Sequence, residues 1–524
     1  MSEYLLPLAN QSVPVSFADE GVEWCGEQIA GLLRERSRLV IIADARVDLL
    51  YGKELLNALA ANGFEVSTAT FEPGEDHKTL RTASTLLDQM AERALARDDV
   101  VIGLGGGVST DVAGFCASVY NRGIRWIAVP TSLLGMVDAA IGGKTGVDHP
   151  LAKNLIGTFH QPLAVIAPLM TLETLPVREW TCGSAEVVKV GLLAGGTLWK
   201  TIEQHGPDLK EWPRDLARKV IPQSAGVKLE IVARDEREHD VRWLLNLGHT
   251  FGHALETVTG YRTFLHGEAV FLGLRAAVAL SHAQGLLSAQ DSTQIDDVLS
   301  RVPLPRADVL SDALIAALAH DKKTRAGKLH WVLLKQLGQP MVTSDVSPVA
   351  VRKVADWVCE IASRGVPVDN CGRMRILVLN GPNLNLLGER EPAIYGDTSY
   401  AELEELICRH AAERNIEILI RQSNLEGELI SLIQQARHWA NGIVLNPGSY
   451  SHTSVGIRDA LSAVTLPAIE VHLSDISKRE DFRRVSLTAP ACRALISGKG
   501  VAGYLEAMEQ LSALIEGNSN KDHE

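Results

Sequence analysis

The feature that most constrains the fold is a pattern that restarts partway along the chain. Short apolar runs alternate with helix-like segments near the N-terminus, as at 39–44 (LVIIAD) and 99–104 (DVVIGL), and the alternation begins again at 374. Such alternation predicts βαβ units and a parallel sheet. Residues 366–373 (VPVDNCGR) have the composition of a linker. At 524 residues the chain is too long for one core, and we expect two parts, 1–365 and 374–524.

The first part is expected to change character along its length. Up to about residue 170 the alternation holds, whereas from about 171 to 300 helical periods replace the strand-like runs. We therefore predict a Rossmann-like α/β part over about 1–170, followed by a mostly helical part over 171–365.

The second part has the pattern of one sheet. Five apolar runs, RILVL, IEILI, GIVLN, AIEVHL and ALISG, are separated by helix-like segments, the first of which opens with the capping box Ser399-x-x-Glu402. The sequence predicts helices at 399–413, 426–439 and 453–462, and a last helix that ends near 516. Five strands in about 150 residues predict a doubly wound parallel α/β domain.

Charge and cysteine content exclude several classes of partner. The formal net charge is −13 and no basic stripe offsets it, which argues against nucleic-acid or anionic-membrane binding and requires any anion site to be local. The seven cysteines are scattered and form no CxxC pair, as in cytosolic proteins. We expect a cytoplasmic protein without a signal peptide or membrane span.

A glycine-rich run, GLGGGVSTD at 103–111, follows a strand-like run and opens a helix. Bare backbone there can approach a pyrophosphate, which amide N–H groups at the helix N-terminus would bind. A tight turn without a ligand is the alternative, because Val108 replaces the third glycine of the usual dinucleotide motif. Asp44, at a strand end, and Glu75 and Lys78, in a polar turn, could bind ribose hydroxyls or face solvent.

A group of histidines indicates a metal site. His249 and His253 are at i and i+4 on one predicted helix face, and His266 follows in a loop-like segment. Glu186, in GSAEVVK, can supply an oxygen ligand. A histidine pair on a helix is also compatible with a structural role, but the third histidine favours metal binding.

Several cations lie in segments rich in Gly, Asn and Asp. Each alone reads as a surface charge, but with a dinucleotide loop and a divalent ion they suggest a phosphorylated, carboxylated small substrate. They are Arg122, Lys144, Lys153, Lys189, Lys228 and Arg242.

The first part resembles 3-dehydroquinate synthase across about residues 1–365. The motifs, in order, are GEDHKTL, GLGGGVSTDVAGF, YNRGI, PTSLLGMVDAAIGGKTGV, KNLIGTFHQP, GSAEVVK, DEREHDVRWLLNLGHTFGHALE and HGEAV. The resemblance implies NAD, one divalent metal (Zn or Co), and cyclisation of 3-deoxy-arabino-heptulosonate 7-phosphate.

The resemblance also implies a role for each matching residue. The implied metal ligands are Glu186, His249 and His266, with His253 beside them as a substrate or proton-relay residue. The implied NAD-binding residues are Asp44, Glu75, Lys78, Gly106, Gly107, Asp111, Thr131, Lys153 and Thr174. The implied substrate-binding residues are Asp138, Lys144 (which we also count as catalytic), Asn154, Lys189, Lys228, Arg242, Asn246 and, from the DKK run at 321–323, Lys322. Arg122 matches an arginine that reaches the phosphate of the neighbouring subunit, which implies a dimer.

Polar residues in the second part follow four predicted strands, at 380–383, 421–424, 446 and 472. The carboxyl ends of parallel strands meet at one edge of a sheet, where a ligand crevice is expected.

LNGPNLNLLGEREPAIYG, RQSNLEGELI, LNPGSYSHTSVGIRDAL and IEVHLSDISKREDFR resemble type II 3-dehydroquinate dehydratase over about 374–517. This implies a flavodoxin-like fold, trimer or dodecamer assembly, and dehydration without a cofactor. Tyr395 would be the general base, with its pKa lowered from about 10 by Arg390. Asn383 would position a water, and His472, oriented by Glu470, would protonate the leaving hydroxyl. Asn446, His452, Asp459 and Arg483 match the substrate pocket.

The product of the first implied reaction is the substrate of the second, so the sequence predicts a bifunctional shikimate-pathway enzyme. The alternatives are another sugar-phosphate cyclase in the first part and a non-catalytic scaffold. Three positions depart from the families: Ala167, where an Asp is usual, Leu425, where a His is frequent, and Asp475, where an Asn is common. The first reads as a folding detail, and for the other two we expect an effect on assembly or affinity.

Overall fold

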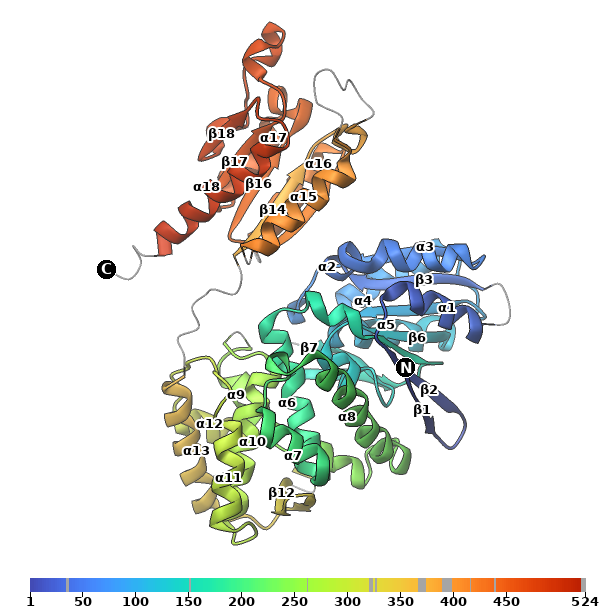
Figure 1. Ribbon diagram of the computed structural model, residues 1–524, viewed down its shortest axis with the longest axis vertical. Helices are drawn as coiled ribbons and strands as arrows, with labels where there is room; N and C mark the ends of the chain where they lie inside the picture. The colour runs from blue at the N-terminus through green and yellow to red at the C-terminus, as the bar shows by residue number, and fades with distance from the viewer. Residues whose placement is uncertain are drawn as a thin grey trace. The chain divides into compact units, whose positions relative to one another are not determined.

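In the computed structural model the chain forms two compact units, Met1–Pro367 and Val368–Glu524 (Figure 1). The structure describes residues 1–33, 37–149, 152–261, 263–319, 324–325, 328–365, 374–388, 398–414, 416–437 and 440–519. The predicted linker 366–373 lies outside the described residues. Among the described helices, none is long and apolar enough to cross a membrane.

The first unit begins with a seven-stranded sheet in the order β1-β2-β9-β6-β5-β3-β4, in which β1 alone is antiparallel to its neighbour. The strands are β1 Ser2–Pro7, β2 Ser12–Ala18, β3 Arg38–Asp44, β4 Glu65–Phe71, β5 Val100–Gly105, β6 Arg125–Pro130 and β9 Val165–Pro168. The predicted strands at 39–44 and 99–104 are therefore confirmed.

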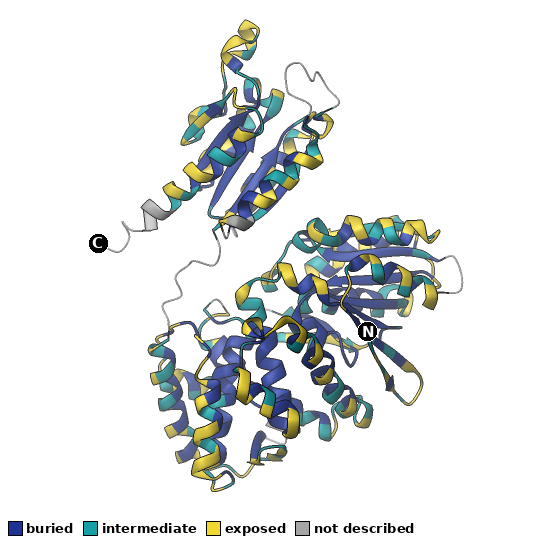
Figure 2. Ribbon diagram, viewed as in Figure 1, coloured by how far each residue is buried: buried dark blue, intermediate teal, exposed yellow. Residues whose placement is uncertain are grey.

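The strands of this sheet are apolar on both faces because each face is covered. Leu39 and Ile41 of β3 belong to one core cluster and Val40 and Ile42 to another, as the alternation of side chains in a strand requires. The helices of this part are α1 Val22–Leu32, α2 Ala45–Val47, α3 Lys53–Ala61, α4 Leu80–Glu92 and α5 Gly107–Val119. Figure 2 shows the buried strands between partly exposed helices.

The rest of the first unit is mostly helical, as predicted. Its helices are α6 Val177–Ala194, α7 Gly196–His205, α8 Arg214–Arg234, α9 His249–Val258, α10 His266–Ala283, α11 Ala289–Leu299, α12 Ser311–Ala319 and α13 Pro348–Ser363. Between 171 and 300 the described residues contain no strand.

Beyond the pair β1–β2, three further antiparallel hairpins in the described part of the first unit were not predicted. They are β7 Lys144–His149 with β8 Ala152–Phe159, β10 Thr324–Arg325 with β11 Lys328–Leu329, and β12 Trp331–Gln336 with β13 Gln339–Thr343. Hairpin β7–β8 contains Gly146 and Gly157, whose backbones approach so closely that a Cβ on Gly157 would lie 2.5 Å from the Thr145 carbonyl oxygen. Glycine has no side chain, so it interrupts the alternation of apolar and polar residues by which a strand is recognised in a sequence.

The second unit contains a five-stranded parallel sheet in the order β15-β14-β16-β17-β18, the flavodoxin-like order. The strands are β14 Arg375–Asn380, β15 Glu417–Gln422, β16 Gly442–Asn446, β17 Ala468–His472 and β18 Ala494–Ser497. The helices are α15 Tyr400–Glu413, α16 Glu426–Ala436, α17 Val455–Ala463 and α18 Ala502–Ser519. All five predicted strands are confirmed, and so is the capping box, because Ser399 N donates to Glu402 Oε2 at 2.7 Å and Glu402 N to Ser399 Oγ at 3.3 Å.

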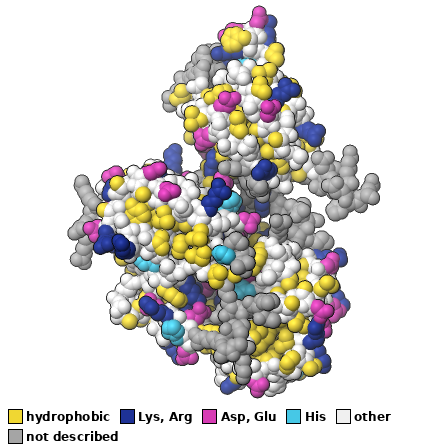
Figure 3. Space-filling model, turned by 180° about the vertical axis from the view of Figure 1, so that it is seen from behind, with side chains coloured by type: hydrophobic (Ala, Val, Ile, Leu, Met, Phe, Trp, Pro, Cys, Tyr) yellow, Lys and Arg dark blue, Asp and Glu magenta, His cyan; other side chains and the backbone are white. Residues whose placement is uncertain are grey.

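On the face drawn in Figure 3, acidic and basic side chains of the described residues are interspersed. This face therefore carries no large patch of a single charge, and an anion site has to be formed by a particular small group of residues.

Candidate active sites

Three side chains predicted as metal ligands converge in the first unit. Glu186 lies within α6, while His249 and His266 are the first residues of α9 and α10. Oε1 of Glu186 lies 3.6 Å from Nε2 of His249 and 3.8 Å from Nε2 of His266. This oxygen is buried and accepts no hydrogen bond from the described residues. One carboxylate and two imidazoles are a donor set that suits Zn²⁺ or a similar divalent ion, and a cation would satisfy that oxygen.

The start of α10 sets the position of His266. A Cβ on Gly267 would lie 2.3 Å from the backbone of Cys182 in α6, so only glycine lets the two helices meet there. Arg178 holds the same turn, because its Nε and Nη2 donate to the two oxygens of buried Glu268 at 2.7 and 2.6 Å. Glu268 in turn accepts from Leu265 N at 2.8 Å.

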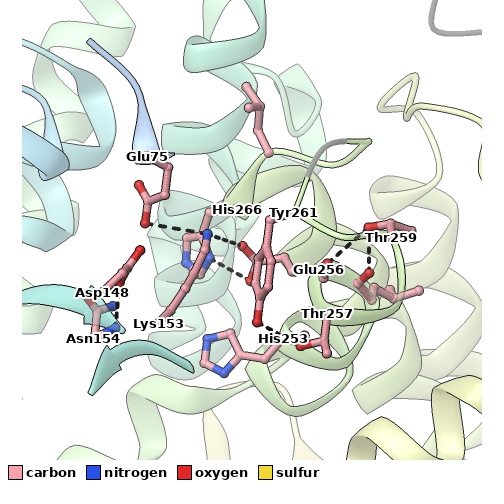
Figure 4. Close-up of polar contacts among 12 residues, drawn as sticks. Glu75, Asp148, Lys153, Asn154, His253, Glu256, Thr257, Thr259, Tyr261 and His266 are labelled. Atoms are coloured by element: carbon pink, nitrogen blue, oxygen red, sulfur yellow. Dashed lines mark hydrogen bonds and ion pairs between the residues drawn. The ribbon is translucent and has the colours of Figure 1, made fainter. Parts of the chain in front are cut away.

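A second carboxylate, Glu256, also lies near His266 (Figure 4). Its Oε2 is 3.4 Å from Nδ1 of His266, and its Oε1 accepts from Lys153 Nζ at 3.0 Å. Burial raises the pKa of Glu256, but His266 and Lys153 outweigh it and hold that pKa well below its usual range. Lys153 also lies 3.5 Å from Glu75 and 4.9 Å from the ring centre of Tyr261.

The prediction for this region missed Glu256. Its signal is in the sequence, because His249, His253 and Glu256 are spaced i, i+4 and i+7 on one helix face. His253 lies beside the predicted ligands, with its ring centre 5.4 Å from that of His249. Together with Glu256 and His266 it forms a second group whose donor atoms lie within 4.8 Å of one another.

The glycine-rich run lies between β5 and α5, as predicted. Gly105 has φ +141°, a region that favours glycine, and Gly106 immediately precedes the first turn of α5. Thr131 N donates to Gly105 O at 2.9 Å, which joins the ends of β5 and β6. Asp44, at the end of β3, accepts from Ser109 Oγ in this helix at 3.0 Å and from two backbone N–H groups of α2.

Lys78 connects the glycine-rich helix to hairpin β7–β8. Its buried Nζ lies 2.6 Å from Asp111 Oδ2 and 2.6 Å from Asn154 Oδ1. Burial opposes the charge of Lys78, yet Asp111 and Glu75 raise its pKa well above the usual value. Asn154, at φ +52°, is further held by Asp148, whose Oδ1 accepts from Asn154 N at 2.7 Å.

Two of the predicted substrate cations, Lys189 and Lys228, lie in ion pairs close to the metal group. Lys189 pairs with Glu186, and Lys228 Nζ lies 2.6 Å from both the carbonyl oxygen and Oδ1 of Asp138. Burial, together with Arg242 and Lys189, lowers the pKa of Lys228 to about 8, although Asp138 opposes the shift. Arg242 is itself buried and donates to the carbonyl oxygens of Gly142 and Glu236.

Glu238 was not predicted as a site residue, yet it joins two that were. It pairs with Lys144, and its Oε1 accepts from Asn246 Nδ2 at 3.2 Å. It adopts φ +59° in the turn between α8 and α9. Its only sequence signal is its place in the motif DEREHD.

Two predicted residues of the first unit, Arg122 and Thr174, lie elsewhere. Arg122 is exposed at φ +65° in the turn after α5, and Thr174 bonds to Tyr51 and to Thr171 O next to α6. Neither contacts the metal group within the described part of the chain. Lys322 lies outside the described residues.

The polar strand ends of the second unit meet at one edge of its sheet. Asn380, Gln422, Asn446 and His472 are the last residues of β14, β15, β16 and β17, and Asn380 is in register with both Gln422 and Asn446. Fully buried Tyr504 of α18 donates to Asn380 Oδ1 at 2.6 Å and accepts from Asn446 Nδ2 at 2.9 Å. Tyr504 was not predicted as a residue of this site.

His472 and Asn383 are held in position at this edge. Nε2 of His472 lies 2.7 Å from Oε1 of the fully buried Glu470. Asn383, at φ +67°, donates its backbone N–H to Asn424 Oδ1 at 2.9 Å.

Three further predicted residues of the second unit, His452, Asp459 and Arg483, are not at the ends of these strands. His452 Nδ1 lies 2.9 Å from Val485 O. Asp459 is exposed on α17, and Arg483 lies 3.9 Å from Glu480 and over the ring of Phe482. Tyr395 and Arg390 lie outside the described residues. Asp475 caps a short turn through Ser477 N and pairs with Lys478 at 3.2 Å, and Leu425 is exposed.

Family models match most of the chain. The model described as 3-dehydroquinate synthase N-terminal matches residues 68–182, and 3-dehydroquinate synthase C-terminal matches 183–324. Dehydroquinase class II matches 374–512. The 3-dehydroquinate synthase of Gloeobacter violaceus is 42% identical over 352 residues, which cover 67% of this chain and 97% of that protein. That of Caulobacter vibrioides is 41% identical over 339 residues, 63% of this chain and 92% of that protein.

Two solved structures are similar to the larger part of the chain. The 2-epi-5-epi-valiolone synthase from Streptomyces hygroscopicus subsp. jinggangensis, with NAD+ and Zn2+ bound, is 30% identical, with a TM-score of 0.62 over 68% of this chain and 99% of that one. A 2-deoxy-scyllo-inosose synthase complexed with carbaglucose-6-phosphate, NAD+ and Co2+ is 23% identical, with a TM-score of 0.62 over 70% and 100%, and supports the fold alone.

Proposed function

We propose two consecutive activities for this chain, from the premise that it belongs to the 3-dehydroquinate synthase family and carries a class II dehydroquinase domain behind that part. Both families are lyases, and the chain is a bifunctional shikimate-pathway enzyme. The first part converts 3-deoxy-D-arabino-heptulosonate 7-phosphate into 3-dehydroquinate and phosphate. The second dehydrates 3-dehydroquinate to 3-dehydroshikimate.

The observation that carries the proposal is the buried oxygen of Glu186 between two imidazoles. Glu186, His249 and His266 hold a divalent ion, which when bound polarises a substrate hydroxyl and acidifies the neighbouring C–H. Glu256 accepts the Nδ1 hydrogen of His266 and so fixes the ring with Nε2 toward Glu186. His253, beside both, is placed to relay a proton.

The glycine-rich turn between β5 and α5 would bind the pyrophosphate of NAD, a cofactor that would supply reversible hydride transfer. Asp44 and Glu75 serve the ribose hydroxyls, and Lys153 lies between the cofactor side and the metal group because it contacts both Glu75 and Glu256.

The substrate is a dianionic phosphate that also carries a carboxylate, and the buried cations provide its partners. Lys228 pairs with Asp138, Lys189 and Arg242 interact electrostatically with the same carboxylate, and Lys144, which is exposed, is joined to Asn246 through Glu238. Cations already held by ion pairs lose little side-chain freedom when the substrate binds. We propose that Arg122 of a second copy contributes to the same anion, which makes the first unit a dimer.

In the second unit His472 donates a proton to the leaving hydroxyl, since Glu470 fixes its ring. Asn383 positions the water that stabilises the enolate, and Asn446, His452, Asp459 and Arg483 bind substrate. Tyr395 acts as the base, with Arg390 as the cation that lowers its pKa. No cofactor takes part in this step, and we propose a trimer or dodecamer for this unit.

A second candidate for the first part is another sugar-phosphate cyclase, because a solved structure that matches it at 30% identity is a valiolone synthase. The fused dehydroquinase domain favours dehydroquinate, since only that product feeds the second reaction.

The test is a coupled assay on the purified chain with NAD and Zn²⁺. Given the heptulosonate 7-phosphate, the chain should release phosphate and form the conjugated enone of 3-dehydroshikimate. Tyr395→Phe should stop the enone and leave phosphate release unchanged. If added 3-dehydroquinate is dehydrated but no phosphate is released, the first part has another substrate or is a scaffold; a scaffold would bind neither NAD nor metal stoichiometrically.

A further inference from the structure

His472 contacts the carboxylate of Glu470, and two hydroxyl side chains, Ser486 and Thr488, donate hydrogen bonds to that carboxylate. Glu470 and His472 are two residues apart on β17, so their side chains project from the same face of the sheet. Their neighbours Ile469 and Val471 point into the hydrophobic core on the other face. Glu470 is therefore a carboxylate with no access to water, whose position depends on the donors around it.

Two hydroxyls from a separate segment supply those donors. Ser486 Oγ donates to Glu470 Oε1 at 2.7 Å, and Thr488 Oγ1 donates to Glu470 Oε2 at 2.6 Å. Ser486 Oγ also accepts from Ala489 N at 3.0 Å, which helps to direct its hydrogen toward the carboxylate. The segment is anchored beside the site, because Leu487 N donates to Ser451 O at 2.7 Å.

We propose that Thr488 and Ser486 are positioning residues for the dehydration step: by bonding the two oxygens of Glu470, they fix the plane of its carboxylate and, through it, the ring of His472. The inference rests on the proposed role of His472 as proton donor. An ionised carboxylate only accepts hydrogen bonds, so Nε2 of His472 donates to Glu470 and Nδ1 remains free to exchange a proton.

The two hydroxyls should differ in importance. Thr488 is fully buried, and among the described residues it alone donates to Oε2, so removal of its hydroxyl leaves that oxygen without a partner. Ser486 shares Oε1 with His472 and is partly exposed, so water can replace only part of what its hydroxyl contributes.

The experiment compares near-isosteric variants in the full chain, with 3-dehydroquinate as substrate and enone formation as the signal. We expect Thr488→Val to lower kcat about tenfold and to change KM by no more than about twofold. A tenfold fall in kcat corresponds to the loss of one buried hydrogen bond in the transition state. Thr488→Ser keeps the hydroxyl and should restore kcat. Thr465→Val, at an exposed threonine of the same unit, is the matched control and should equal the wild type. Phosphate release by the first unit and the melting temperature report whether each variant is folded.

The inference is rejected if Thr488→Val stays within about twofold of the wild type, or if Thr488→Ser loses as much as Thr488→Val. Ser486→Ala, at a partly exposed position where folding is less at risk, gives a second test: kcat about threefold lower at constant KM supports the inference, and an unchanged kcat contradicts it. A wild-type chain that does not dehydrate 3-dehydroquinate would refute the proposed function itself, and the inference would fall with it.

Discussion

The candidate site of the first unit is built from ion pairs between separate elements, whereas that of the second lies along the edge of one sheet and is held mainly by hydrogen bonds. Lys153 joins Glu75 to Glu256, and Lys228 joins α8 to Asp138. In the second unit strand register places Asn380 beside Asn446, and the Tyr504 hydroxyl joins their side chains. The difference teaches that a site built from buried charges must compensate each of them, while a parallel sheet positions neutral groups by topology.

The largest expected effect is that of substituting a predicted metal ligand, which should abolish the activity of the first unit and leave that of the second unchanged. Glu186→Gln should lower phosphate release about a thousandfold and abolish stoichiometric Zn²⁺ binding, because an amide replaces the only carboxylate of the group. Dehydration of added 3-dehydroquinate should not change. The assay is phosphate release together with metal content after dialysis.

Glu211→Gln, at an exposed carboxylate of the same unit, is the matched control and should bind metal normally. Zinc retained at full stoichiometry by Glu186→Gln would show that this carboxylate is not a ligand.

The converse experiment breaks the second site and spares the first. Tyr504→Phe removes the hydroxyl between two buried amides and leaves Asn380 Oδ1 without its donor, at a cost of about 1–3 kcal/mol. We expect kcat/KM for dehydration to fall about tenfold while phosphate release stays normal. Tyr4→Phe, on the edge strand β1, should affect neither reaction. A normal dehydration rate would mean that register alone positions Asn446.

A smaller effect follows from the burial of cations. Since the pKa of Lys228 is lowered to about 8, its charge is present below that pH and is lost above it. The KM for the heptulosonate phosphate should therefore rise severalfold between pH 7 and 9.5, and the KM for 3-dehydroquinate should not rise in parallel. Lys228→Arg stays charged throughout and should show a flatter profile. A wild-type KM that is constant over this range would contradict the prediction.

The smallest expected effect is on stability alone. Ser399→Ala removes the cap of α15 and should lower the free energy of unfolding of the second unit by about 1 kcal/mol, with both activities unchanged. Ser462→Ala, which removes a hydroxyl bonded to Arg458 O within α17, is the control and should be close to neutral. If the two variants unfold at the same urea concentration, the Ser399 cap does not stabilise the second unit.

Prediction from the sequence succeeded where a signal lies within a few residues. The capping box at Ser399, the glycine turn at 105–107 and the strand ends at Asn446 and His472 were all placed correctly. It missed hairpin β7–β8, where glycines interrupt the apolar pattern, and it missed Glu238, Glu256 and Tyr504, whose partners are brought to them by packing.

The sequence by itself determined the order of strands and helices in the second unit, the doubly wound sheet that they form, and the residue types available for chemistry, because these depend on periodicity and on local backbone preferences. Only the tertiary structure decided which charges meet. Glu186, His249 and His266 begin or occupy three different helices, and their convergence requires the close contact that Gly267 permits between α6 and α10. Likewise, Thr488 contacts Glu470 only because its segment folds back over β17. Such contacts depend on side-chain packing between elements distant in sequence, which no local pattern encodes.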